Sequence, residues 1–146
     1  MSPVGEPDAA ANPELRSRRP ARVDDVTALR HDLAGWISAH HLTGDLAGDV
    51  ELATYEALSN AANHAYPHRV DGTVELHGRH QPGLVRITVT DHGHWQPPAS
   101  DPDEQHGRGL PLIHALPDHA TVDLTELGTI VTMTWHLDQH HSSGTT

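Results

Sequence analysis

The sequence predicts an α+β protein, a two-layer α/β sandwich with helices packed on one face of a mainly antiparallel mixed β-sheet. Two segments in the first half, residues 22–41 and 45–66, place apolar side chains at the three- and four-residue spacing of amphipathic helices. Residues 72–91 and 119–137 are rich in β-branched residues, and each segment is interrupted by a short turn sequence, which is typical of hairpins. Because the helices are grouped rather than alternating with strands, an antiparallel sheet covered on one side is favoured.

Local signals set the limits of these elements. The letters TGD after the first helix supply a break and an N-cap, and Pro67 ends the second helix. The turns QPG and ELG divide the two hairpins, and residues 110–116 form a short helix that stops at Pro117. The first helix carries one apolar stripe, which consists of Val23, Val26, Leu29, Leu33, Trp36, Ile37 and His40.

The chain is expected to form one domain, residues 22–138, between two disordered ends. Residues 1–21 are rich in Pro, Ala and Gly and read as a disordered arm, and residues 139–146 read as a disordered tail. Residues 92–109 form a stretch of 18 residues rich in Pro, Gly and Asp. Structureless segments longer than about 12–15 residues are uncommon in compact domains unless they are functional lids or disordered.

Composition excludes several classes of protein. The absence of cysteine rules out disulfides, thiolate zinc sites and a cysteine nucleophile. No apolar run reaches membrane-spanning length and the first twenty residues contain no apolar h-region, so we expect a cytoplasmic protein without membrane contact. The formal charge of −11 argues against direct nucleic-acid binding. With 15 histidines in the chain, a single histidine is weak evidence for a site.

The sequence EALSNAANHAY, residues 56–66, places polar residues on the edge of an alanine-rich helical face. At about 100° per residue, Glu56, Asn60 and Asn63 fall along one edge of the apolar arc, and His64 falls inside it. Two interpretations are open: a helix with a polar shoulder and a core histidine, or a ligand site. The second is favoured if these groups are buried, because an unpaired buried polar group costs about 1–3 kcal/mol unless a ligand pairs with it. A Glu can orient or deprotonate a nucleophile, and Asn and Glu oxygens suit Mg²⁺.

Three later motifs add chemistry to this edge. Asp91 ends a strand in VTDHGHW, where a carboxylate can accept a hydrogen bond from an exocyclic amine, and Gly93 lets a flat ring approach the backbone. In GRGLPLI a glycine-flanked turn opens a helix, whose free N–H groups favour phosphate. A Gly-Thr pair then precedes the last strand. Each motif alone is weak, and the evidence is the set and its order.

In this order the motifs resemble the ATP-binding fold shared by gyrase, Hsp90, histidine kinases and MutL, and in particular its small single-domain branch, the anti-sigma-factor serine/threonine kinases (RsbW-like proteins). The resemblance covers about residues 23–137. EALSNAANHAY is similar to the N box of that family. VTDHGHW, GRGLPLI and GTIVTMTW are similar to its first, second and third glycine boxes.

The resemblance implies a role for each matching residue. Glu56 would be the general base, Asn60 the Mg²⁺ ligand and Asp91 the residue that reads adenine. His64 is as well explained by a structural role as by a phosphate contact. The remaining nucleotide contacts implied by the resemblance are Asn63 on the helix, Gly93 beside the ring, Gly107, Arg108, Gly109 and Leu110 by the phosphates, and Thr129 near the adenine.

Two features depart from the family pattern. Trp95 stands where the first glycine box ends in glycine, so the start of the lid must differ. The lid is acidic at Asp101, Asp103 and Glu104, and Arg108 is the only cation near it. Because phosphoryl transfer depends on charge neutralisation, these departures affect the expected catalytic rate more than nucleotide binding.

The resemblance implies an enzyme that is also a switch. It would bind ATP and Mg²⁺, sequester a sigma factor, phosphorylate a STAS-domain anti-anti-sigma factor and form a homodimer. A binding module of the same fold with weak or no kinase activity is the main alternative. A sensor histidine kinase is a third interpretation, but this chain leaves no room for the helical hairpin that carries the phosphorylated histidine. A fourth is a histidine metal site, for which DHGH and HLDQHH supply ligands.

Overall fold

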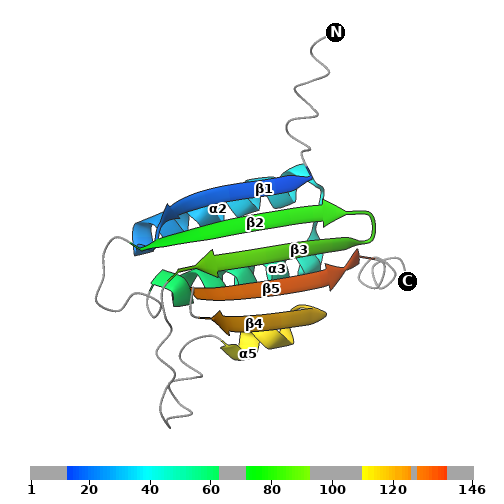
Figure 1. Cartoon of the computed structure of the whole chain (residues 1–146). Helices are drawn as coiled ribbons and strands as arrows, with labels where there is room; N and C mark the ends of the chain where they lie inside the picture. Colours follow the sequence, from blue (N-terminus) through cyan, green and yellow to red (C-terminus); the bar gives the residue numbers. More distant parts are fainter. Residues whose placement is uncertain (1–12, 63–71, 93–109, 126–127, 138–146) are drawn as a thin grey trace.

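The computed structural model describes residues 13–62, 72–92, 110–125 and 128–137. They form a two-layer sandwich of one five-stranded sheet and helices on one of its faces (Figure 1). The elements in chain order are β1 (Glu14–Pro20), α2 (Val23–Ala39), α3 (Gly44–Asn60), β2 (Thr73–Gln81), β3 (Leu84–Asp91), α5 (Leu110–Ala115), β4 (His119–Thr125) and β5 (Gly128–His136).

The strand order in the sheet is β1-β2-β3-β5-β4, and each of the four pairings between these strands is antiparallel. The predicted α+β sandwich and both predicted hairpins are therefore confirmed. The parallel pairing that a mixed sheet would contain does not occur among the described strands. Strand β5 lies between β3 and the edge strand β4, which places the beginning of β5 next to the end of β3.

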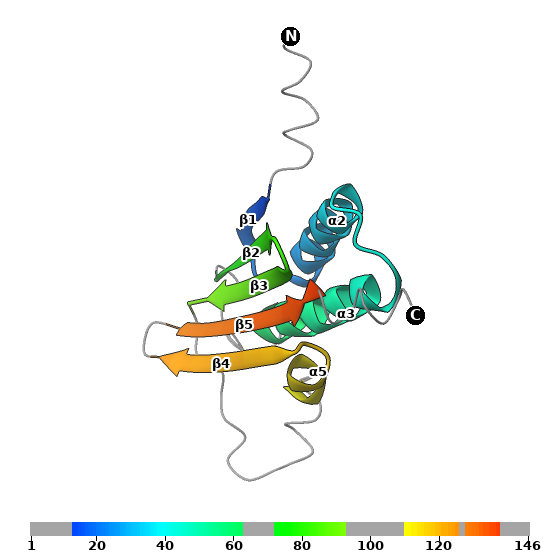
Figure 2. The ribbon, with the colours of Figure 1, turned by 90° about the vertical axis from the view of Figure 1, so that its right-hand side faces the viewer.

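The helices cover a single face of the sheet. Figure 2 shows the sheet nearly edge-on, with α2 beside β1 and β2, and α3 beside β3 and β5. The short helix α5 packs against α3 and β4. Alternate residues of the three central strands point into this layer, as the period of two in a strand requires. The buried apolar residues of these strands are Val74, Leu76, Val85, Ile87, Val89, Val131, Met133 and Trp135.

The stripe predicted for the first helix is mostly confirmed. Val26, Leu29, Leu33, Trp36 and Ile37 are buried on α2. Val23 is exposed because it begins the helix, ahead of the first turn that reaches the sheet. No helix in the described part of the chain is long and apolar enough to cross a membrane.

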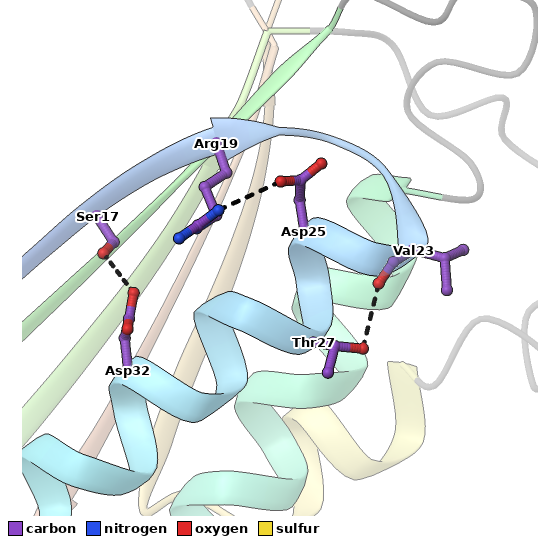
Figure 3. Close-up of polar contacts among 6 residues, drawn as sticks. All are labelled: Ser17, Arg19, Val23, Asp25, Thr27 and Asp32. Atoms are coloured by element: carbon purple, nitrogen blue, oxygen red, sulfur yellow. Dashed lines mark hydrogen bonds and ion pairs between the residues drawn. The ribbon is translucent and has the colours of Figure 1, made fainter.

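The prediction that residues 1–21 are a disordered arm is wrong for β1. Residues Glu14–Pro20 pair with β2 along their whole length and form an edge of the sheet. The strand is also attached to α2: the Ser17 hydroxyl donates to Asp32 Oδ2 at 3.0 Å, and Arg19 Nη1 donates to Asp25 Oδ1 at 3.4 Å (Figure 3). Figure 3 also shows the hydroxyl of Thr27 donating to the Val23 carbonyl, at 3.3 Å, in the first turn of α2. A local reading of polar, Pro-flanked sequence misses a strand whose partners are distant in the chain.

The second helix begins and continues as predicted. Helix α3 runs to Asn60, and Ala61 and Ala62 extend it in a wider, π-type turn. Such turns occur frequently at functional sites. The predicted final residues, 63–66, lie outside the described residues.

Candidate functional site

The ends of three secondary-structure elements meet at one end of the sandwich. The last turn of α3, the end of β3 and the beginning of β5 lie together there in both views (Figures 1 and 2). Asn60 ends α3, Asp91 ends β3, and Thr129 follows the first residue of β5. All three are buried, with exposures of 3%, 2% and 1%. They are three of the five buried polar residues in the described chain, so the predicted positions coincide with the places where the core becomes polar.

The register of the sheet places Asp91 beside Thr129. They are directly opposite each other across β3 and β5, and on its other side Asp91 is opposite Val74 of β2. Both side chains lie on the helix-covered face, because Val89 and Val131, two residues away on the same strands, are buried there. A buried carboxylate needs hydrogen-bond donors, and an amine group is one donor that a carboxylate at this position can accept from.

Gly128 allows this close approach. Its φ is 144°, and a Cβ at this position would lie 2.0 Å from the Asp91 carbonyl oxygen and 2.7 Å from His92 Cα. The adjoining turn is closed by Thr125, whose hydroxyl donates to the Gly128 carbonyl at 2.9 Å and accepts from the Gly128 N–H at 3.1 Å. Gly128 therefore fixes Thr129 relative to Asp91. Sequence reasoning gave it no role, although a glycine directly before a β-branched strand was the available signal.

Glu56 and Asn60 lie four residues apart on one edge of α3, as the helical wheel predicts. Glu56 is half-buried at this edge, and Asn60 is buried. Asn60 Nδ2 is enclosed and has no hydrogen-bond partner among the described residues. Since the amide oxygen and nitrogen exchange places when the side chain flips, the unpaired atom can be presented as a donor or an acceptor. An unpaired buried amide costs about 1–3 kcal/mol, which supports the ligand interpretation over a polar shoulder.

The alanines of α3 have a packing role. Ala53, Ala57 and Ala61 are fully buried, as the predicted apolar arc requires. Their small side chains let the helix lie close to the sheet, with Asn60 beside the ends of β3 and β5. This is the expected consequence of an alanine-rich face.

Several predicted site residues cannot be placed. Leu110 begins α5, but its side chain is not described. The predicted residues outside the described part of the chain are Asn63, His64, Gly93, Trp95, Asp101, Asp103, Glu104, Gly107, Arg108 and Gly109.

The alternative of a histidine metal site gains no support. Within the described ranges no group of three or more His, Asp or Glu side chains is arranged to hold a metal ion. Of the two candidate motifs, DHGH contributes only Asp91 and His92 to these ranges, and HLDQHH contributes only His136 and Leu137.

The fold, with a polar cluster at the ends of α3 and β3, defines the class as an ATPase-type α+β sandwich. Residues 19–135 match the sequence profile of the histidine kinase-like ATPase domain. The chain belongs to that family. The match extends over most of the chain and includes every described site residue.

Similar proteins agree with this assignment. The serine-protein kinases RsbW of Staphylococcus aureus strains bovine RF122 / ET3-1 and MRSA252 are each 29% identical over 138 residues, which cover 84% of this chain and 86% of theirs. The RsbU and RsbW domains of Rv1364c from Mycobacterium tuberculosis share the fold with a TM-score of 0.68 at 24% identity, over 86% of this chain and 32% of that chain. The histidine kinase domain from the Erythrobacter litoralis EL346 blue-light activated histidine kinase gives a TM-score of 0.59 at 26% identity, over 78% of this chain and 63% of that chain. The resemblance to RsbW-like proteins is thus confirmed.

Proposed function

We propose that this protein is an ATP- and Mg²⁺-binding anti-sigma factor and serine/threonine protein kinase that phosphorylates a STAS-domain anti-anti-sigma factor. The observation that carries the proposal is the buried, incompletely paired Asn60 at the same end of the sandwich as the buried Asp91 and Thr129. The similarity to serine-protein kinase RsbW over 84% of the chain supports the kinase class.

The described residues fit the adenine end of a nucleotide. The Asp91 carboxylate would accept from the exocyclic amine of adenine, and Thr129 would support this contact from the neighbouring strand. Gly93 would leave room for the ring. The exocyclic amine of adenine can donate a hydrogen bond to the buried carboxylate of Asp91, which a purely hydrophobic ligand cannot do.

Asn60 fits the phosphate and metal end. Its amide oxygen would coordinate Mg²⁺, a cation that prefers oxygen ligands and retains several waters. Bound ATP·Mg²⁺ supplies a transferable phosphoryl group whose charge is partly neutralised. The other contacts proposed at this end are Asn63, Gly107, Arg108, Gly109 and Leu110.

Glu56 would act as the general base toward the partner's hydroxyl. It lies one helical turn before Asn60 and is only half-buried. A base that must reach a hydroxyl on another protein has to remain accessible, and this position meets that requirement.

Phosphorylation would then act as the switch. A phosphoserine or phosphothreonine adds about −1.5 to −2 charges at the contact surface of the partner. That charge would release the STAS protein from this acidic chain and leave the chain available to sequester a sigma factor. We include a cytoplasmic homodimer in the proposal.

Calorimetric titration of ATP with and without Mg²⁺ tests the nucleotide site. Wild type should bind, Asp91→Asn should lose affinity under both conditions, and Asn60→Ala should lose only the Mg²⁺-dependent part. Absence of binding by wild type would reject the proposal. A metal response that Asn60→Ala leaves unchanged would reject the Mg²⁺ assignment alone.

Transfer of labelled γ-phosphate tests the kinase. Wild type and Glu56→Gln would be incubated with labelled ATP and STAS-domain proteins of the same organism. We expect transfer by wild type and a loss of about 100-fold or more in Glu56→Gln. ATP binding without transfer to any STAS protein would replace the kinase by the catalytically inactive binding module.

A further inference from the structure

The face of the sheet that no described helix covers carries four of the seven arginines in the described chain. This is the face toward the viewer in Figure 1, and we call it the open face. All nine Lys or Arg residues of the chain are arginines, and the open face carries Arg16, Arg18, Arg79 and Arg86 together with the acidic residues Glu14, Glu75 and Asp123. Arg18 pairs with Glu75 at 3.7 Å. Helices α2 and α3 carry Arg30 against seven acidic residues, Asp24, Asp25, Asp32, Asp45, Asp49, Glu51 and Glu56.

Two of these arginines are directly opposite each other. The β2–β3 register pairs Arg79 with Arg86, and both residues are exposed. Like charges in directly opposite positions destabilise a sheet. Arg86 Nε donates to the hydroxyl of Thr134 at 3.3 Å, and neither arginine has a carboxylate within ion-pair distance in the described ranges. The sheet thus keeps an unfavourable pair of like charges that no ion pair in the described chain neutralises.

Glu14 compensates only part of this charge. It is opposite Arg79, and its Oε1 lies 3.1 Å from Arg16 Nε and 3.4 Å from His77 Nε2. The hydrogen bond from Arg16 lowers the pKa of Glu14, and His77 and Arg79 add to the effect. One carboxylate is shared among Arg16, His77 and Arg79, and Arg86 lies beyond it. We call Arg16, Arg79 and Arg86 the basic patch.

The neighbouring surface leaves the basic patch accessible. On the open face, Thr88, Thr132 and Thr121 follow His77 across β3, β5 and β4, and Thr134 and His119 follow Arg86. Threonine side chains are short and uncharged, so they neither cover the guanidinium groups nor neutralise them. The result is a hydroxyl-lined surface on which Arg79 and Arg86 carry positive charge without a carboxylate at ion-pair distance in the described ranges.

We propose that the basic patch is a docking surface for an acidic segment of a partner protein, a stretch of exposed Asp and Glu side chains. Guanidinium groups bind carboxylates through paired, charge-assisted hydrogen bonds. Because the rest of this chain is acidic, a negatively charged partner is repelled elsewhere and is steered to this face. A nucleic acid fits less well, since a patch this small offers few phosphate contacts against a net charge of −11.

The test uses the full chain and a fluorescein-labelled peptide of six glutamates separated by serines. Matched peptides carry glutamine or lysine in place of glutamate. In fluorescence polarisation at about 0.05 M salt the glutamate peptide should bind, and at about 0.5 M salt binding should be lost. Arg79→Gln and Arg86→Gln should each weaken it by about five- to tenfold. Arg30→Gln, which removes the same charge from α2, should bind as wild type does.

Thermal unfolding and light scattering complete the test. Because Arg79 and Arg86 oppose each other, each glutamine variant should melt at the wild-type temperature or above it. Equal binding of the glutamine peptide, or an equal loss in Arg30→Gln, would overturn the proposal. So would a change of oligomeric state in Arg79→Gln or Arg86→Gln, which would make the face a contact between copies of this chain. Preferential binding of a DNA oligomer of the same charge would also overturn it.

Discussion

The two ends of the sandwich differ in how completely their polar groups are paired. At the end with Asp91, buried polar side chains gather around the junction of β3 and β5, and Asn60 Nδ2 has no partner among the described residues. At the opposite end, where β2 turns into β3, Nδ1 of His40 lies 2.7 Å from Nδ1 of His80. The Asp91 end thus has an unpaired amide beside its buried carboxylate, whereas at the other end the two histidines pair with each other and Trp135 Nε1 has no partner among the described residues.

The end with His80 is also closely packed. The Trp36 ring lies 4.8 Å from the His40 ring, and the absence of a side chain at Gly78 admits Trp36, since a Cβ there would lie 3.2 Å from the indole. The Leu137 N–H donates to the Gly83 carbonyl at 2.8 Å, beside this turn. We therefore expect polar substitutions that keep the backbone of the Asp91 end to alter ligand binding, and substitutions at the His80 end to alter stability alone.

Gly128→Ala should have the largest effect, because Gly128 is the structural residue of the Asp91 end. The added Cβ would lie 2.0 Å from the Asp91 carbonyl oxygen at a φ of 144°, so the junction of β3 and β5 must open. We expect a loss of at least about 3 kcal/mol in the free energy of unfolding, measured by urea denaturation.

Gly35→Ala is the matched control, because Gly35 is exposed on α2 and a Cβ there would have no neighbouring atom within 4 Å. It should stabilise the protein by about 0.5–1 kcal/mol. A Gly128→Ala variant with the same midpoint urea concentration as wild type would contradict this prediction. It would show that β3 and β5 can separate at this junction without a loss of stability, so that the junction does not hold Asp91 in place.

Asp91→Asn tests the same end without a steric change. It replaces an acceptor by a group that also donates, so an amine bound there loses its partner. The affinity for ATP should fall by at least about tenfold, or about 1.4 kcal/mol. His80→Gln should leave ATP affinity unchanged in the same calorimeter. An equal loss in both variants would show that the two ends are not separate.

How far the sequence predicted this molecule depends on distance along the chain. Helices α2 and α3 and both hairpins follow from periodicity and turn residues, which are local signals. Asn60 could be chosen because it lies on the edge of the apolar arc of a predicted helix, and Asp91 because it ends a predicted strand. Strand β1 could not be recognised, since it is held by β2, and its Ser17 by Asp32, 15 residues away.

Features that depend on register were also beyond the sequence. The close approach of Gly128 to Asp91 exists only because β5 returns beside β3. Arg79 and Arg86 become opposed through the hairpin, and His40 and His80, 40 residues apart, meet across two elements. In each case the contact is determined by tertiary pairing, which local propensity does not encode.

The His80 end should respond to pH. Burial lowers the pKa of His80 from its ordinary value of 6.5, and the charge of His40 lowers it further. The unfolded chain therefore takes up this proton at higher pH than the folded chain does. Stability should be complete above about pH 6.5 and should fall as pH decreases toward the lowered pKa, by at most about 1.4 kcal/mol per pH unit.

Urea denaturation of wild type and His80→Gln between pH 7.5 and pH 5 isolates this contribution from that of the other histidines. The difference between the two proteins should shrink as the pH falls. A constant difference would mean that His80 keeps its ordinary pKa in the folded protein and that the histidine pair is not closed on itself.

The smallest effect is expected between the two ends, where Ser17 joins β1 to α2. Its hydroxyl donates to Asp32 Oδ2 at 3.0 Å on an exposed surface. Because water competes for both groups, a double-mutant cycle of Ser17→Ala and Asp32→Ala should give a coupling free energy of only about 0.5–1 kcal/mol. Backbone pairing with β2 would then carry most of the attachment of β1. A coupling above about 2 kcal/mol would show instead that this side-chain bond secures the edge strand, and the contrast between the two ends would have to include a third region on which stability depends.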